Sequence, residues 1–228
     1  MPRTFIFDAV HTVLRPVPDV RSAYFDAGLR HGSDLSREQV GDRFRVARRQ
    51  RFSTYVAASQ TQPGALPSSD EIEFELWRGL VSDIFLGLES VGPLFDELWN
   101  HFASPDNWQL YDDVSSCFLR LKERGDRIVI ASNFDSRLHD IVAKHDSLGI
   151  ADSVFCSAEI GYRKPDPLFY KTVAESLGLC ESDDVTMIGD DFENDYVAPV
   201  RFGWKAFHLD RRSKTNHRQD TINSLSSI

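Results

Sequence analysis

Short runs of apolar residues recur along the chain, and polar turn residues and then a helical pattern follow most of them. Five of the runs have the length of β-strands, at residues 5–7, 128–131, 154–156, 185–188 and 204–208. Continuous apolar runs are typical of parallel strands that are buried on both faces of a sheet. Helix candidates lie between them, such as 114–123, where Asp112 or Asp113 is the expected cap and Gly125 the expected stop. This alternation of strand and helix predicts a doubly wound, parallel, Rossmann-like α/β sheet.

The alternation is interrupted between about residues 16 and 106, a span much longer than an ordinary connection between a strand and its helix. The interrupting segment has a helical pattern. Ser36 and Gln39 have the spacing of a capping box, and residues 71–85 and 94–102 carry apolar side chains at helical intervals. We therefore predict that a helical domain is inserted into the α/β core.

The two ends of this insert are rich in turn-forming residues. Residues 15–18 read Arg-Pro-Val-Pro and residues 104–107 read Ser-Pro-Asp-Asn, so we expect the insert to hang on two linkers. Residues 63–69 are expected to form a loop within it, and the polar segment 211–228 is left without assigned structure. The predicted domains are a core of residues 1–15 and 106–228 and a helical domain of residues 16–105.

The amino-acid composition and net charge narrow the class of molecule that the protein is expected to bind. The chain has 228 residues, of which 41% are hydrophobic, enough to form a substantial core. Its formal net charge of -9 disfavours electrostatic binding to nucleic acid or to an anionic membrane. We therefore expect a small-molecule substrate and leave the oligomeric state open.

The number and spacing of the cysteines help to identify the cellular compartment. Cys117, Cys156 and Cys180 are scattered, odd in number and without a C-x-x-C pair, so neither a disulfide framework nor a structural zinc site is indicated. We expect all three to be small buried residues. The N-terminus lacks the apolar stretch of a signal peptide, and no run of about 18 uncharged apolar residues could span a membrane. A cytoplasmic protein fits these observations best.

Polar residues follow three of the predicted strands at the point where each strand ends. Asp8 follows the first strand, Ser132 and Asn133 follow the second, and Asp190 follows the run that ends at 189. In an open α/β sheet, ligands bind outside the carboxyl ends of the strands, so these groups should converge. Lys164, in a proline-stiffened turn, is a fourth candidate.

These residue types suit phosphoryl transfer through an aspartyl phosphate. Asp8 would attack phosphorus, while Lys164 and a divalent metal offset negative charge and Ser132 holds a non-bridging oxygen. Mg²⁺ fits the cluster because it is a hard cation that carboxylates, a backbone carbonyl and water can satisfy.

The same residues resemble the motifs of the haloacid dehalogenase-like hydrolase superfamily. Residues 8–12, Asp-Ala-Val-His-Thr, resemble its D-x-D-x-T motif, Ser132 resembles the second motif, and Lys164 the third. Residues 189–195 resemble the fourth, G-D-x-x-x-x-D. The resemblance covers essentially the whole chain and is strongest to the uncharacterised hydrolase domain-containing branch. It implies that the helical insert is a mobile cap that selects substrate.

The resemblance also implies a role for each matched residue. Asp8 would be nucleophile and metal ligand, the Val10 carbonyl and Asp190 further ligands, and Asp195 a water-mediated ligand or a partner of Lys164. The residues implied to bind substrate are Thr12, Ser132, Asn133 and Lys164.

Val10 departs from the motif, which has a second Asp at this position. That side chain normally protonates the leaving group and activates water, a role worth ~10²–10⁴-fold in rate. Valine can do neither, so we expect turnover to be slow or restricted to good leaving groups such as acyl phosphates. His11 titrates near neutrality and could substitute, but its side chain could equally point away from the phosphate.

Other interpretations remain. The chain could be a noncatalytic phosphate-binding or protein-interaction module, or a 2-haloacid dehalogenase, although such dehalogenases usually carry Tyr at the second position and need no metal. Phosphonoacetaldehyde hydrolases use a cap lysine, and no lysine precedes Lys122. The arginines between 43 and 51 are expected to form a solvated helix face rather than a receptor for an anionic substrate. Substrate identity is left open.

Overall fold

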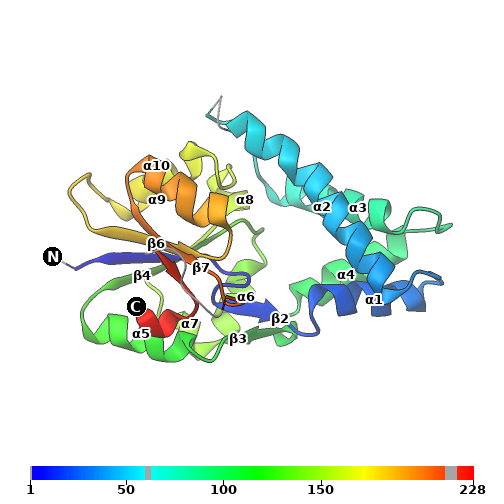
Figure 1. Ribbon diagram of the computed structural model, residues 1–228, viewed down its shortest axis with the longest axis horizontal. Coiled ribbons are helices and arrows are strands. Elements are labelled where there is room, and N and C mark those ends of the chain that lie inside the picture. Colours follow the sequence, from blue (N-terminus) through cyan, green and yellow to red (C-terminus); the bar gives the residue numbers. More distant parts are fainter. Residues whose placement is uncertain (1, 60–62, 214–219) are drawn as a thin grey trace.

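A parallel six-stranded sheet lies at the centre of the core (Figure 1). The computed structural model describes residues 2–59, 63–213 and 220–228, so the parts of the expected domains at 1, 60–62 and 214–219 lie outside the described residues. In sheet order the strands are β5 (Ser153–Cys156), β4 (Arg127–Ser132), β1 (Thr4–Phe7), β6 (Val185–Gly189), β7 (Lys205–Leu209) and β8 (Thr221–Ile222). The five predicted strands all form, which confirms the doubly wound α/β fold.

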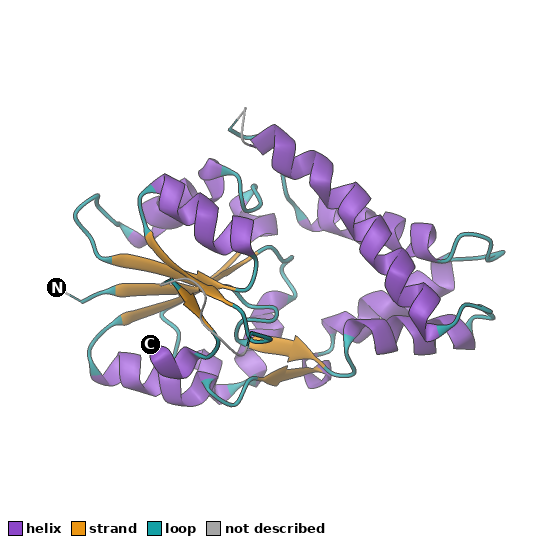
Figure 2. Ribbon diagram, viewed as in Figure 1, coloured by secondary structure: helices purple, strands orange, loops and turns teal. Residues whose placement is uncertain are grey.

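Successive residues of each strand face opposite sides of the sheet, and each side has its own hydrophobic cluster. Phe5 and Phe7 of β1 belong to one cluster, whereas Ile6 belongs to the other. The first cluster includes residues of α5 (Val114–Glu123), α6 (Leu138–Lys144) and α7 (Asp146–Gly149). The second includes residues of α9 (Pro167–Leu177) and α10 (Ala198–Phe202). Figure 2 shows helices on both sides of the sheet. The sheet is therefore buried on both faces.

Four helices make up the insert and bury a third hydrophobic cluster among themselves. They are α1 (Val20–Arg30), α2 (Arg37–Ser59), α3 (Asp70–Ile84) and α4 (Gly92–Ala103). The predicted capping box forms at the start of α2, where the Gln39 amide donates to Ser36 Oγ and the Ser36 amide to Gln39 Oε1. In the described part of the chain, no helix is both long and apolar enough to cross a membrane.

The joints of the insert differ from the expected linkers. β2 (Leu14–Pro16) pairs antiparallel with β3 (Trp108–Leu110), so a two-stranded ribbon carries the insert. A 3₁₀ turn, η1 (Pro105–Asn107), precedes β3. Proline normally signals a turn, but Pro16 is tolerated here because a two-stranded ribbon has only edge strands.

The insert also contacts the core at a third place, which the sequence did not predict. The backbone amides of Gly64 and Leu66 donate to the Asp166 carboxylate at 2.9 and 3.2 Å. Glu73 at the start of α3 pairs with Arg163 at 2.8 Å, and both side chains are buried. The expected loop at 63–69 is thus docked on the core.

The C-terminal segment, left unassigned from sequence, closes one edge of the sheet. β8 pairs with β7, and the short η3 (Leu225–Ser227) follows it. Asp113, one of the two expected caps of α5, makes no capping hydrogen bond to that helix. Its carboxylate instead accepts hydrogen bonds from Arg211, Ser224 Oγ and the Leu225 amide.

Candidate active site

The site lies where the carboxyl ends of β4, β1 and β6 meet. Phe7 of β1 is level with Ile130 of β4 and Ile188 of β6. The residues that follow, Asp8, Ser132 and Asp190, therefore reach the same edge of the sheet although up to 182 positions separate them in the chain.

Lys164 is the centre of the charge network. It lies in the turn between α8 (Ser157–Ile160) and α9, and its side chain is only 1% exposed. Its Nζ donates to Asp195 Oδ1 at 2.6 Å, to Asp8 Oδ1 at 2.8 Å and to the Ala131 carbonyl at 3.1 Å. Ser132 Oγ also donates to Asp8 Oδ1, at 2.9 Å. Two donors from different elements thus fix the orientation of the Asp8 carboxylate.

Asn133 and Thr12, both expected to bind substrate, form hydrogen bonds with backbone groups. The Asn133 side chain accepts from the Lys164 amide at 2.7 Å and donates to the Lys164 carbonyl at 2.9 Å. Thr12 is fully buried, and its Oγ1 accepts from the Asp190 amide at 3.1 Å. In this structure the two residues hold the Lys164 turn and the Asp190 loop in place.

Asp195 reaches the site from a π-helical turn, η2 (Phe192–Val197). Its two carboxylate oxygens contact Lys164 Nζ and the Asp191 amide, so it is placed as the partner of Lys164. Gly189 makes room for it, because a Cβ added at that position would lie 2.6 Å from the Asp195 Cβ. That steric requirement depends on the fold and gives no signal in the sequence beyond the G-D motif.

The electrostatics of the site favour a bound cation. Burial and the adjacent Asp8 and Asp195 carboxylates raise the pKa of Asp190, and burial likewise raises the pKa of Asp195 despite Lys164. Burial alone would lower the pKa of Lys164, but the two carboxylates outweigh it and raise the pKa, so the lysine is charged.

The donor set fits a hard divalent ion. One oxygen each from Asp8, Asp190 and Asp195 lie within 4.8 Å of one another. An all-oxygen set of this kind suits Mg²⁺, and the charge of such an ion would offset the excess of carboxylates over the single ammonium group.

Val10 and His11 occupy the loop that follows Asp8. Val10 is half-buried and packs against the core cluster that includes Phe7. His11 has a left-handed backbone, with φ +64°. Desolvation lowers the pKa of His11 and Asp8 raises it, while Arg48 and Arg212 lower it further. The net pKa is lowered, so the imidazole is neutral at pH 7.

The arginines between 43 and 51 form a largely solvated face, as expected. Four of the five are exposed, and Arg51 is half-buried. Arg43 also donates to the Ile84 carbonyl, and Arg51 pairs with Asp83, both within the insert. Arg48 is close enough to His11 to affect its pKa.

Comparison with known proteins agrees with this geometry. A family model described as haloacid dehalogenase-like hydrolase matches residues 2–203. The bovine haloacid dehalogenase-like hydrolase domain-containing protein 3 is 27% identical over 215 residues, which cover 90% of this chain and 80% of that protein.

Solved structures share the fold at low identity. The L-2-haloacid dehalogenase of Xanthobacter autotrophicus superposes with a TM-score of 0.73 and 18% identity, covering 100% of this chain and 96% of the other. The putative HAD-hydrolase YfnB of Bacillus subtilis, bound to magnesium, gives a TM-score of 0.72 at 16% identity, covering 99% and 96%. At this identity the likeness establishes the fold alone.

Proposed function

Because the chain belongs to the haloacid dehalogenase-like hydrolase family, we propose that it is a Mg²⁺-dependent phosphohydrolase with restricted leaving groups. The observation that carries the proposal is the network in which Lys164 and Ser132 both donate to Asp8 Oδ1. Such a network orients a carboxylate for nucleophilic attack.

The reaction would proceed through an aspartyl phosphate. Asp8 attacks the phosphorus of a small phosphorylated substrate and the leaving-group oxygen departs; water then hydrolyses the acyl phosphate and restores the carboxylate. Ser132 and Lys164 would stabilise the non-bridging oxygens. Asp8, Asp190 and the Val10 carbonyl would hold Mg²⁺, which would offset negative charge on nucleophile and phosphate. Asp195 would hold Lys164 in place.

The leaving group would have to depart without a proton from position 10. Val10 is aliphatic and packs against the core, so it can neither donate a proton nor activate water. Acyl phosphates and aryl phosphates with acidic phenols would therefore be hydrolysed faster than sugar or glycerol phosphates. The helical insert, docked at its loop on Asp166, would act as the cap that restricts access to Asp8.

Replacement of Val10 tests this proposal. The wild-type protein should hydrolyse acetyl phosphate and p-nitrophenyl phosphate in a Mg²⁺-dependent manner and glycerol phosphate barely. Val10→Asp should raise kcat/KM for glycerol phosphate by ~10²–10⁴-fold, because it restores an acid and base beside Asp8. Val10→Asn is the matched control. Asn is polar and about as large as Asp, but it cannot donate or accept the catalytic proton, so this variant should give no gain in kcat/KM.

Thermal melts of both variants would show that the half-buried position tolerates a polar side chain. Rapid hydrolysis of alkyl phosphates by the wild-type protein would contradict the restriction. An unchanged rate in a folded Val10→Asp variant would contradict the proposed role of this position.

The missing acid and base also supports a second candidate, a noncatalytic phosphate-binding module on the same fold. Mg²⁺-dependent binding of beryllium fluoride, lost in Asp8→Asn, together with no turnover of any phosphate ester, would favour that candidate. A dehalogenase is less favoured, since position 10 is not Tyr and the carboxylate cluster suits a metal. Halide release from 2-haloacids without metal would support it.

A further inference from the structure

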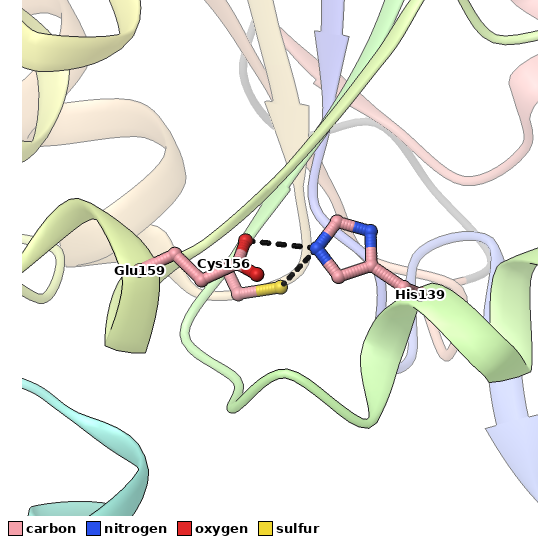
Figure 3. A group of neighbouring side chains, drawn as sticks. All are labelled: His139, Cys156 and Glu159. Carbon is pink, nitrogen blue, oxygen red and sulfur yellow. Dashed lines mark hydrogen bonds and ion pairs between the residues drawn. The ribbon is translucent and has the colours of Figure 1, made fainter.

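Three side chains of different chemistry converge beside the candidate active site (Figure 3). His139 comes from α6, Cys156 from the end of β5 and Glu159 from α8. His139 Nε2 lies 2.8 Å from Glu159 Oε2 and 3.5 Å from Cys156 Sγ. One ligand atom from each residue lies within 4.8 Å of the other two. Because Cys156 is level with Ser132 on the adjacent strand, this cluster is a close neighbour of the Asp8 site and shares no residue with it.

The cluster combines a buried thiol with two accessible partners. Cys156 is fully buried, whereas the side chains of His139 and Glu159 are 43% and 49% exposed. An ion could therefore enter from solvent and still bind the sulfur. The imidazole and the carboxylate therefore lie toward solvent, and the thiol lies toward the core.

The surroundings of the sulfur carry negative charge. Burial raises the pKa of the Cys156 thiol, and the Glu159, Asp135 and Asp70 carboxylates raise it further. A thiol in such a place is protonated and a poor nucleophile. The same negative charge that opposes a thiolate favours a divalent cation, which would lower the cost of ionising the sulfur.

We propose that His139, Cys156 and Glu159 bind a zinc ion, with water as the fourth ligand. Tetrahedral Zn²⁺ with its usual bond lengths places neighbouring ligand atoms about 3.3–3.8 Å apart. The Nε2 to Sγ distance of 3.5 Å already falls within this range, and the Nε2 to Oε2 distance of 2.8 Å would have to lengthen slightly. Thiolate and imidazole suit zinc and are poor ligands for Mg²⁺, so this site and the Asp8 site select different ions.

The proposed zinc binding conserves both charge and protons. The Cys156 thiol loses one proton to solvent, and thiolate and Glu159 carboxylate together neutralise the two charges of the ion. No oxidation or reduction occurs. Zinc uptake should therefore release one proton per chain and weaken as the pH falls.

The bound ion would tie three core elements together next to the docked insert. α8 carries Glu159, and its Ser157 Oγ lies 3.2 Å from Ser68 Oγ of the insert. Gly161, directly after α8, accepts a hydrogen bond from the Ser68 amide at 2.9 Å. Fixing α8 to α6 and β5 would therefore stiffen the surface on which the insert rests.

Cobalt is the probe that tests this site, because a cobalt–thiolate bond has a charge-transfer absorption that an all-oxygen site cannot produce. The full-length protein in excess Mg²⁺ should bind one Co²⁺ with this band, and Zn²⁺ should displace it. Cys156→Ser should abolish the band, and His139→Gln and Glu159→Gln should weaken Co²⁺ binding by about 10²-fold or more, since even outer-shell changes cost 10–100-fold. Cys180→Ser is the matched control, because Cys180 is exposed, and it should leave the band unchanged.

Asp190→Asn separates the two sites. It removes a carboxylate of the Mg²⁺ cluster and should leave the cobalt–thiolate band intact, so the readout does not depend on phosphatase turnover. The proposal is overturned if no thiolate band forms, if the band survives Cys156→Ser, or if His139→Gln and Glu159→Gln bind Co²⁺ as tightly as the wild type.

The expectation that all three cysteines are buried is wrong for Cys180, which is exposed.

Discussion

Single residues at this site act as much through their shape as through their charge. Gly189 ends β6 directly beside Asp195, whose side chain leaves no room for a Cβ at position 189. Ser132 and Lys164 orient Asp8, while Asn133 holds the Lys164 backbone. The orientation of the Asp8 carboxylate therefore also depends on residues that do not contact it directly.

Gly189→Ala should push Asp195 away from Lys164. The added Cβ would collide with the Asp195 side chain, and relieving the collision moves buried atoms at a cost of about 1–3 kcal/mol. We expect a lower free energy of unfolding and at least a tenfold loss of kcat/KM with acetyl phosphate. Gly149→Ala is the control: a Cβ there meets nothing within 4 Å, and stability and activity should stay unchanged. A Gly189→Ala variant with wild-type activity would contradict the steric role.

The sequence predicted which side chains would meet, because residues that follow buried parallel strands share one sheet edge. It could not predict what each side chain touches there. Thr12 and Asn133 match positions expected to bind substrate, yet their hydrogen bonds go to the backbones of Asp190 and Lys164. Such contacts depend on loop conformation, which periodicity does not encode.

At the scale of elements, the strands and long helices followed from their patterns, whereas short and polar elements did not. β2 and β3 have three residues each, too few for a period to be recognised, and β2 itself ends at a proline, Pro16. The C-terminal segment is polar and has no pattern that predicts an element, but Arg211 and Ser224 contact Asp113 at the start of α5. These are long-range contacts, which local propensity does not predict.

Asp113→Asn should detach this C-terminal segment. Burial would raise the pKa of Asp113, but hydrogen bonds from Arg211, Ser224 and the Leu225 amide outweigh it and hold the pKa below 3.8, its ordinary value. The folded state thus prefers the carboxylate, and this stabilisation is present above pH 3.8 and lost as the pH falls through the lower, folded pKa. The variant should be less stable by about 2 kcal/mol at neutral pH.

Urea unfolding between pH 3 and pH 7 measures this difference. The gap in the free energy of unfolding between wild type and Asp113→Asn should be constant above about pH 5. It should shrink below pH 3.8, because only the wild type has a carboxylate at position 113 to protonate. Asp112→Asn, at the exposed neighbour, should show no gap. A gap that does not change with pH would show that the carboxylate charge is not what holds the segment.

For the whole molecule, the main difference from expectation is how the insert is held. Two linkers were expected, and the structure adds a docked loop and a buried ion pair between Glu73 and Arg163. These partners are 90 residues apart, and neither has a local pattern that points to the other. Such pairing becomes visible only when insert and core are placed together.

Glu73→Gln should loosen the insert without removing the shape of the side chain. The Arg163 guanidinium, whose side chain is 8% exposed, would remain buried beside a neutral amide. Removing one charge of a buried pair costs up to about 3–5 kcal/mol, because the buried guanidinium loses this carboxylate. We therefore expect a lower free energy of unfolding and faster amide exchange at Gly64, Leu66 and Ser68, whose amides donate to the core.

Hydrogen exchange read by mass spectrometry, together with urea unfolding, distinguishes local from global effects. If Glu73 mainly holds the insert to the core, exchange should rise in the docked loop more than in β1 or β6, where backbone amides belong to the central sheet. Glu71→Gln, at an exposed position in the same helical turn, should change stability by less than about 0.5 kcal/mol. Equal exchange in wild type and Glu73→Gln would mean that the Glu73–Arg163 ion pair is not needed to hold the docked loop on the core.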